Sequence, residues 1–566
     1  MSFAREGGDI RNIRYLLSIA ASGLISGTLL SLFYLSFNYL WSEVMPVMLS
    51  SRRFIFLFTM LGLALSFVLI YSFTQSRFTQ SGTHVALEKY HLNSGQITAR
   101  ETAVNSFASF FTIALGGSAG LDGPSVVLGG GISSILSRFM HFPVDMRKRT
   151  FLAGIAAGLA SIFKAPLTAI LFALEIPYKR DLEREAYVEV AIAAVSSYLI
   201  TVALIGPQSI FGVSVSIPQL SLSTIATTIL LALICGAYAF FFVRTYNLAD
   251  ALAKRFFVRG GFGLLLLAGG LVLGAIGYFD FNALGPGYNV VTLLINGNGA
   301  YTLAGLILLL LLRLLSTTIT LNFGGTGGLL IPAVVEGSVL GSIFSSVLYG
   351  SVNPLYVAVG IAAMIAATHK VILTPIAFVA ETLGPAVIVP AVLASVFSNF
   401  VSGGQSFFAT QPYSKYKEEE LALERIYSKV AKSAPSVLAS LTAADVMTRS
   451  PVSIGGDDTI EQALKVFERV PYRVLPVVDS YGRPISTVKL EDVATAPPRL
   501  LKTPVSATYS EIPITVSPST PLEEIIRTII ETGKDHVFVV DDDYRLVGVI
   551  AAIDIAKKLV HYYSVY

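Results

Sequence analysis

Hydrophobic positions are spread very unevenly along this chain of 566 residues. In residues 14–412, apolar stretches long enough to cross a bilayer as helices of about 20 residues alternate with shorter apolar segments that glycine and proline interrupt. The predicted spanning helices begin near Tyr15, Phe54, Val188, Thr224, Gly263, Tyr301 and Ile388. The interrupted segments cover residues 105–135, 151–177, 323–349 and 355–382. Irregular backbone at membrane depth must be buried in protein or line a watery cavity, so the pattern indicates an α-helical polytopic membrane protein with an internal pathway.

The interrupted segments of the two halves repeat each other. Residues 116–129 (GGSAGLDGPSVVLG) align without a gap with residues 324–337 (GGTGGLLIPAVVEG), and 8 of the 14 positions are identical. A second matching pair of segments follows in the same order. Its members at one common offset are Lys164/Lys370, Thr168/Thr374, Phe172/Phe378 and Glu175/Glu381. Because matching interrupted segments are typical of transport sites between repeats, we expect internal repeats over roughly 14–206 and 224–412.

Residues 413–566 follow a different pattern. A linker is expected over residues 413–441, with a short helix over 421–431. Beyond it, helical and strand periodicity alternate twice. The predicted helices and strands cover residues 459–468, 473–478, 521–531, 536–540 and 546–550. This repetition predicts two α/β units, residues 442–500 and 501–566.

Composition and charge separate the same two parts. Over the whole chain 53% of residues are hydrophobic and 14% are charged, against about 25% charged in soluble proteins. Of the 40 basic and 37 acidic residues, 18 and 21 lie in residues 413–566. Such a composition excludes a nucleic-acid-binding protein and a disordered chain. The basic excess of the first part is typical of short cytoplasmic loops, so we expect a cytoplasmic N-terminus over residues 1–13, a retained first span and a location in the cell membrane.

The duplicated glycine-rich segment suggests how an anion would be bound. Glycines precede an apolar helix that begins near Asp122, and a helix N-terminus presents free amides and a partial positive charge. Two opposing N-termini would hold a halide without a fixed cationic side chain. Asp122 would compete with the anion for these amides, which would make it a gate and a candidate proton acceptor. The alternative is that Asp122 only caps its helix.

With these segments, residues 14–416 resemble the CLC family of chloride channels and proton-coupled chloride transporters. The family's gating motif, Gly-(Arg/Lys)-Glu-Gly-Pro, is similar to residues 120–124 (GLDGP). Its Gly-x-Phe-x-Pro motif is similar to residues 328–332 (GLLIP), and its Gly-Ser-Gly-Ile-Pro motif matches residues 80–84 (QSGTH) less closely. The segment from Ala157 to Glu175 resembles the family's strongest signature. The central tyrosine of the family corresponds to Tyr413.

The resemblance implies a homodimer in the lipid bilayer, with one chloride pathway through each subunit and inverted repeats within it. The hydroxyl groups of Ser81 and Tyr413 would coordinate a central anion. The amides near two helix N-termini would line the same path. The residues implied there are Leu121, Gly123, Leu329, Leu330 and Ile331.

Three departures from the family pattern affect the expected mechanism. The gating glutamate is replaced by Asp122, which is shorter by one methylene. The inner glutamate that loads protons in the family's transporters corresponds to Ile176, which cannot carry a proton. The proline of the first motif is His84, a residue that titrates near neutrality but is also common as an ordinary loop residue. We therefore favour a passive, voltage- or ligand-modulated chloride channel, with a proton-coupled exchanger using another proton route as the alternative and a ligand sensor that no longer transports as the second alternative.

The tail resembles a tandem pair of CBS domains. The resemblance rests on residues 444–447 (ADVM), 474–479 (VLPVVD) and 546–550 (LVGVI). Such pairs commonly bind adenine nucleotides. By resemblance, Asp492 and Asp554 would accept hydrogen bonds from the ribose hydroxyl groups, and Tyr472 would stack on the adenine base. The alternative is a purely structural, dimerising pair. The sequence has no nucleophile–base pair, metal-ligand cluster or Walker-type loop, so no enzyme, metal site or required cofactor is expected.

Overall fold

The computed structural model describes residues 8–74, 78–213, 215, 221–297, 301–415, 427, 438, 441–470, 472–494, 496, 500–509, 511–532, 534 and 536–563. The chain divides into two compact units between Lys415 and Tyr416. This division falls close to the expected start of the linker. The helix predicted over 421–431 lies, apart from residue 427, outside the described residues.

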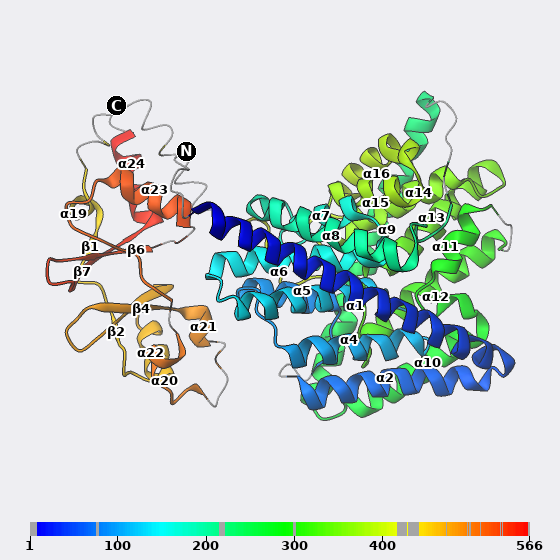
Figure 1. Cartoon of the computed structure of the whole chain (residues 1–566), viewed down its shortest axis with the longest axis horizontal. Coiled ribbons are helices and arrows are strands. Elements are labelled where there is room, and N and C mark those ends of the chain that lie inside the picture. The colour runs from blue at the N-terminus through cyan, green and yellow to red at the C-terminus, as the bar shows by residue number, and fades with distance from the viewer. Residues whose placement is uncertain are drawn as a thin grey trace. The chain divides into compact units, whose positions relative to one another are not determined.

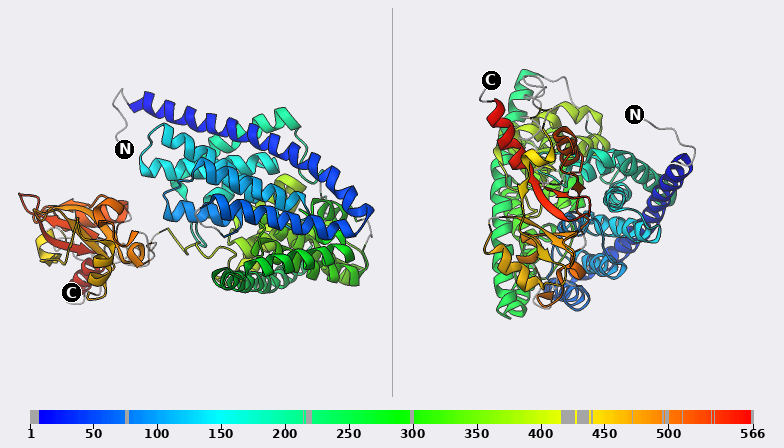
Figure 2. Two further views of the ribbon diagram at one scale, coloured as in Figure 1. Left: turned by 90° about the horizontal axis from the view of Figure 1, so that it is seen from below. Right: turned by 90° about the vertical axis from the view of Figure 1, so that its left-hand side faces the viewer.

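The first unit consists of helices, which Figures 1 and 2 show packed side by side. The α-helices of the first half are α1 (Gly8–Ser50), α2 (Arg53–Phe73), α3 (Gly82–Leu92), α4 (Ala99–Ala114), α5 (Asp122–Phe139), α6 (Val144–Phe163), α7 (Pro166–Glu175) and α8 (Tyr187–Ile205). Those of the second half are α9 (Leu222–Val258), α10 (Phe262–Phe279), α11 (Tyr288–Ile295), α12 (Leu303–Asn322), α13 (Leu330–Tyr349), α14 (Pro354–His369), α15 (Leu373–Leu383) and α16 (Ile388–Val401). Short 3₁₀ turns are η1 (Arg184–Ala186), η2 (Phe281–Ala283) and η3 (Pro385–Val387).

Seven helices among the described residues are long and apolar enough to span a membrane. Six of them begin where the hydrophobic pattern predicts. The seventh is α13, which the sequence predicted to be interrupted over 323–349, whereas the predicted span from Ile388 forms α16, a helix of only 14 residues. The interruption is confined to residues 323–329, because Pro332 falls in the first turn of α13, where proline is tolerated.

Glycines inside the helices serve close packing, and they do so in the same way in both halves. A Cβ atom on Gly129 of α5 would lie 2.2 Å from the carbonyl oxygen of Gly154 in α6. A Cβ atom on Gly337 of α13 would lie 2.3 Å from the carbonyl oxygen of Gly360 in α14. Such small-residue contacts let membrane helices approach closely. The α5–α6 and α13–α14 pairs are therefore equivalent packing units, which agrees with the duplication seen in the sequence.

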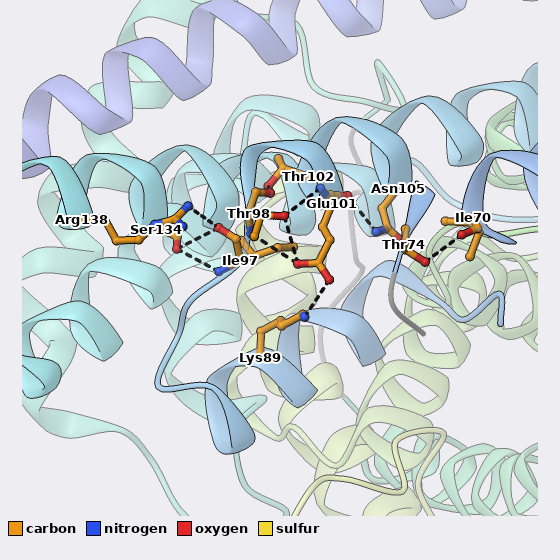
Figure 3. Close-up of polar contacts among 10 residues, drawn as sticks. All are labelled: Ile70, Thr74, Lys89, Ile97, Thr98, Glu101, Thr102, Asn105, Ser134 and Arg138. Carbon is orange, nitrogen blue, oxygen red and sulfur yellow. Dashed lines mark hydrogen bonds and ion pairs between the residues drawn. The ribbon is translucent and has the colours of Figure 1, made fainter. Parts of the chain in front are cut away.

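A polar network fixes the connection between α3, α4 and α5 (Figure 3). Thr98 and Glu101 form a capping box at the start of α4, which satisfies two helix-end N–H groups. The Glu101 carboxylate also pairs with Lys89 of α3 at 3.1 Å. From α5, the Arg138 guanidinium donates to the carbonyl oxygen of Ile97 at 2.8 Å. These contacts hold together the helices whose N-terminal ends carry Ser81 and Asp122.

The second unit contains two small sheets with helices. The helices are α19 (Ala443–Val446), α20 (Ile460–Phe467), α21 (Leu490–Ala494), α22 (Val505–Thr508), α23 (Leu522–Thr532) and α24 (Ala552–Tyr563). The strands are β1 (Thr448–Arg449), β2 (Ile454–Gly455), β3 (Val474–Val478), β4 (Pro484–Lys489), β5 (Thr515–Val516), β6 (His536–Val540) and β7 (Leu546–Ala551). The strand orders are β2-β3-β4 and β1-β7-β6-β5, and each sheet joins one parallel pair (β2–β3, β5–β6) to an antiparallel hairpin (β3–β4, β6–β7). The two predicted α/β units are thus present, with their main helices and strands close to the expected positions.

The two α/β units exchange their first segments. Strand β1 pairs with β7 of the second sheet, with Thr448 opposite Val549. Conversely, Val505 lies in the core of the first unit beside Ile460 and Leu475. Residues on both sides of the proposed 500/501 boundary therefore contribute to the first core, and the pair is one interlocked body.

Candidate functional site

The centre of the membrane unit is a junction between the two duplicated loops. The N–H group of Gly120 donates to the carbonyl oxygen of Gly328 at 2.9 Å, and the N–H of Gly328 donates to Gly120 at 2.8 Å. The N–H of Gly82, at the start of α3, donates to the carbonyl oxygen of Gly327 at 2.9 Å. This short two-sided bridge and the bond from Gly82 bring together the first turns of α3, α5 and α13.

Asp122 lies at this junction, and its side chain crosses from one repeat to the other. It is the first residue of α5 and is 1% exposed. Its carboxylate accepts hydrogen bonds from the N–H groups of Leu330 at 3.1 Å and Ile331 at 3.4 Å, in the first turn of α13. The shorter aspartate thus reaches the opposing helix N-terminus. Two of the amides expected to bind an anion are engaged by a carboxylate from the same chain.

Ser81 directly precedes Gly82 at the same junction. It is the N-cap residue of α3, it is 1% exposed, and its hydroxyl oxygen accepts from the N–H of His84 at 3.3 Å. The hydroxyl hydrogen remains available to donate. Ser81 borders a small cavity of about 20 Å³, which is room for one water-sized occupant.

Tyr413 does not border this cavity. Its side chain is 54% exposed, and its ring lies under the Lys179 ammonium group, 4.9 Å from the ring centroid. Its carbonyl oxygen accepts from the N–H of Arg180 at 2.9 Å, which fixes the segment to the loop after α7. The tyrosine that does border the cavity with Ser81 is Tyr246 of α9. The sequence paired Ser81 with Tyr413, whereas the structure brings Ser81 together with Tyr246.

Ile176 stands where the resemblance implies a proton-loading glutamate in the family's transporters. It is buried directly after α7. Its carbonyl oxygen accepts from the Gln411 side chain at 2.9 Å. The preceding residue, Glu175, has both carboxylate oxygens engaged. They accept from the N–H groups of Ile372, Leu373 and Thr374 and from the Thr374 hydroxyl, at 2.6–3.0 Å. Glu175 therefore caps a helix of the other repeat.

Glu381 does the same in the reverse direction. Its carboxylate accepts from the N–H groups of Leu167 and Thr168 and from the Thr168 hydroxyl, at 2.6–3.0 Å. Each repeat thus caps a helix of the other through an equivalent glutamate.

Two buried charged residues near the junction were missed from the sequence. Arg313 of α12 is 1% exposed, and its guanidinium donates to the carbonyl oxygens of Leu284 and Gly285 and to the Ser118 hydroxyl. Glu336 of α13 is also 1% exposed; its Oε2 atom accepts from the Tyr238 hydroxyl at 2.8 Å, and its Oε1 atom has no hydrogen-bond partner within the described part of the chain. The sequence feature that could have identified each residue is a single charged side chain within an apolar helix. Together they place a buried cation and a buried carboxylate beside the helices that form the junction.

The amides of Leu121, Gly123 and Leu329 lie at the same junction, and their roles stay predictions. In the described residues no group of three or more His, Cys, Asp or Glu side chains is placed to hold a metal ion.

The candidate nucleotide residues lie in both α/β units. Asp492 is in α21 and is exposed, whereas the Asp554 carboxylate accepts from the N–H of Ala551 at 3.3 Å and so caps α24. Tyr472 is 42% exposed just before β3. Although Asp492 is exposed, surrounding protein atoms remove part of its hydration, and this desolvation, only partly opposed by the Lys489 charge, raises the pKa of Asp492 above its ordinary value. Their joint role in binding a nucleotide stays a prediction.

Comparison with known sequences follows the same division of the chain. Residues 61–403 match the family described as voltage gated chloride channel, and residues 443–499 and 507–561 each match the CBS domain. An uncharacterized protein of Methanocaldococcus jannaschii is 29% identical over 284 residues, which cover 50% of this chain and 70% of that protein.

Solved structures share the fold at lower sequence identity. A slow cyanobacterial Cl⁻/H⁺ antiporter is 22% identical with a TM-score of 0.61, over 69% of this chain and 94% of the antiporter. A CLC-type fluoride/proton antiporter is 20% identical with a TM-score of 0.61, over 72% and 99% of the two chains. A eukaryotic CLC transporter is 17% identical with a TM-score of 0.63 and covers 96% of this chain and 98% of its own. The last similarity extends over the tail as well as the helical unit.

Proposed function

Because this chain belongs to the voltage-gated chloride channel family, with CBS domains after its membrane helices, we propose that it is a passive chloride channel gated by Asp122. The pathway would run through the junction of α3, α5 and α13. We further propose that it is a homodimer in the cell membrane, with its N-terminus and CBS pair in the cytoplasm.

The observation that carries the proposal is the Asp122 carboxylate on the amides of Leu330 and Ile331. A carboxylate and a chloride ion need the same donors, so the two compete for one position. When Asp122 moves away, the amides are released to a passing anion. Neutral donors suit rapid passage, since binding must be weak enough for the ion to leave.

The apolar character of Ile176 supports a passive channel over an exchanger. A proton-coupled mechanism needs a titratable group that loads protons from the inner side. Ile176 supplies none, and Glu175 beside it is occupied by four hydrogen bonds to the other repeat. Proton movement would therefore require a different route.

A proton-coupled exchanger is the second candidate. Two of the solved structures that share this fold are of proteins described as proton antiporters, one for chloride and one for fluoride. In that case Asp122 would carry the proton as well as gate the anion.

One flux experiment separates the candidates. The purified protein in liposomes is expected to release chloride when the voltage is clamped with an ionophore, without moving protons against their gradient. Proton uptake driven by a chloride gradient would identify an exchanger instead. If no chloride flux is observed, the remaining candidate is a ligand sensor that does not transport. Asp122→Ala is the matched variant and should increase chloride release.

We propose that the CBS pair regulates the pathway and that it does so by binding an adenine nucleotide. The expected result is a thermal shift of the full chain with ATP, ADP or AMP that is lost in Asp554→Ala. Asp543→Ala, in an exposed acidic turn, is the control that should keep the shift. No shift in the unaltered chain would leave the pair with a structural role.

A further inference from the structure

The cavity beside Ser81 contains a titratable side chain that the channel mechanism does not use. The polar residues that line it are Thr79, Gln80, Ser81, His84, Tyr246, Asn247, Asp250 and Asn322. Most of these donate or accept hydrogen bonds as neutral groups. His84 and Asp250 are the lining side chains that can change their charge near or below neutral pH, and the Asp250 carboxylate is already paired with Lys254.

His84 is held at the cavity by its backbone and not by its ring. It lies in the first turn of α3, where its N–H donates to the Ser81 hydroxyl oxygen at 3.3 Å. Within the part of the chain that the structure describes, the imidazole ring makes no hydrogen bond, and its side chain is only partly exposed. A ring nitrogen is therefore available to an occupant of the cavity, next to the Ser81 hydroxyl.

The charges that face the His84 ring come from α9. They are the Asp250 carboxylate and the Lys254 ammonium group, and these two pair with each other at 2.7 Å. The carboxylate is thus already compensated. A positive imidazolium in a partly buried place needs a negative partner, and a small anion in the cavity would provide one.

From this arrangement we propose that His84 is a ligand of the transported anion and that it takes up a proton when the anion is bound. The inference rests on the proposed function and assigns to that pathway a pH-sensitive anion site. An anion beside Ser81 would then receive a charged hydrogen bond from the protonated imidazole in addition to the neutral one from the Ser81 hydroxyl. No bond is made or broken, and the proton comes from the solvent.

The test is chloride binding measured by calorimetry between about pH 5 and pH 8, the range in which histidine titrates. It is made in an Asp122→Asn background, so that the gate's own titration does not contribute. Coupling to one proton predicts an affinity that rises as pH falls, by up to about tenfold per pH unit. Adding His84→Gln should keep a neutral donor and remove this pH dependence. Adding His84→Phe should weaken binding at every pH.

His141→Asn is the control, because His141 is exposed in the loop between α5 and α6. It should leave the pH dependence unchanged. An Asp122→Asn protein whose chloride affinity does not vary with pH would overturn the proposal, as would the same pH dependence with His84→Gln added. If His84→Phe does not fold, the glutamine variant alone decides. Loss of chloride flux in the unaltered chain would count against the channel, whereas the binding data test His84 separately.

Discussion

Asp122 is held by two backbone amides and by no cationic side chain that the structure describes. Its hydrogen bonds of 3.1 and 3.4 Å are longer than the length of about 2.9–3.0 Å that is most common for N–H···O hydrogen bonds. A buried carboxylate in such contacts is only moderately stabilised, so an anion can replace it. The gate thus depends on competition for the amides of Leu330 and Ile331.

Asp122→Ala is expected to raise chloride affinity by about tenfold or more, because it removes a competitor whose hydrogen bonds to amides are worth about 1.5–3 kcal/mol each. Calorimetry of the purified protein would measure this change. Asp122→Asn is the matched control, since it keeps the shape and a weaker acceptor and should give an intermediate affinity. Equal chloride affinities in all three proteins would contradict the competition.

Among the residues of the site, those set by a local motif were predictable. The glycine-rich loop places Asp122 at a helix start whatever else the chain does, and the small residues around Ser81 place it at another. Tyr413 depends on the path of the chain after α16, which Gln411 fixes through three distant carbonyl groups. The positions of Arg313 and Glu336 likewise depend on how α9, α12 and α13 pack, and no local pattern contains that information.

At the scale of whole helices, the two repeats stabilise each other through their helix ends. Glu175 caps α15 and Glu381 caps α7, so each short helix begins on a carboxylate from the other half. A charge at a helix N-terminus is favourable because of the helix dipole, and here it also satisfies free N–H groups. These two contacts link the repeats more strongly than apolar packing alone would.

Glu175→Ala is expected to lower the free energy of unfolding by at least about 3 kcal/mol, since several N–H groups lose a charged acceptor. Denaturant unfolding in detergent would measure the loss. Glu175→Gln should recover part of the stability, because it keeps an acceptor oxygen. Glu185→Ala should cost at most about 1 kcal/mol, because the Glu185 side chain is 54% exposed and its ion pairs lie near the surface.

Close helix packing gives a second prediction at this scale. Gly129→Ala is expected to destabilise the helical unit, because the new methyl group would lie 2.2 Å from the Gly154 carbonyl oxygen and force α5 from α6. Gly263→Ala is the matched control, since nothing lies within 4 Å of its Cβ position in α10. This control should be neutral or stabilising by up to about 1 kcal/mol. Thermal unfolding followed by size-exclusion chromatography would compare the two, and similar behaviour would contradict the close contact.

The helix boundaries show why the sequence predicted most elements but not α13. Periodicity and caps are local, so α20 begins after Thr459 and β6 covers His536–Val540 as expected. In α13 the glycines at 337 and 341 resemble breaks. They continue the helix because the backbone of α14 lies against them, and this contact is formed by residues in the next helix.

Over the whole molecule, the two compact units have separate apolar cores. The tail core includes Ile525, Ile529 and Val539, all fully buried. The interlocked α/β pair is expected to unfold as one body, because the first segment of each half lies in the other.

Ile529→Ala is therefore expected to destabilise the tail by about 2–5 kcal/mol through the cavity it leaves, without affecting the helical unit. Hydrogen exchange of the full chain would show faster exchange throughout both sheets. Ile512→Ala is the control, since Ile512 is 79% exposed and should change stability by less than about 0.5 kcal/mol. Faster exchange confined to the second sheet would contradict the interlocked arrangement.

The hydrogen bonds that join Asp122 and Glu175 to the second repeat have a consequence for biosynthesis. The first repeat leaves the ribosome with Asp122 and Glu175 already in place, but the amides they bind belong to residues made some 200 positions later. Until α13 and α15 are inserted, two carboxylates at membrane depth have no partners, and such groups are costly in lipid. Membrane insertion of this chain is therefore expected to finish in one late step, and a chain stopped after α8 should be retained by chaperones and degraded.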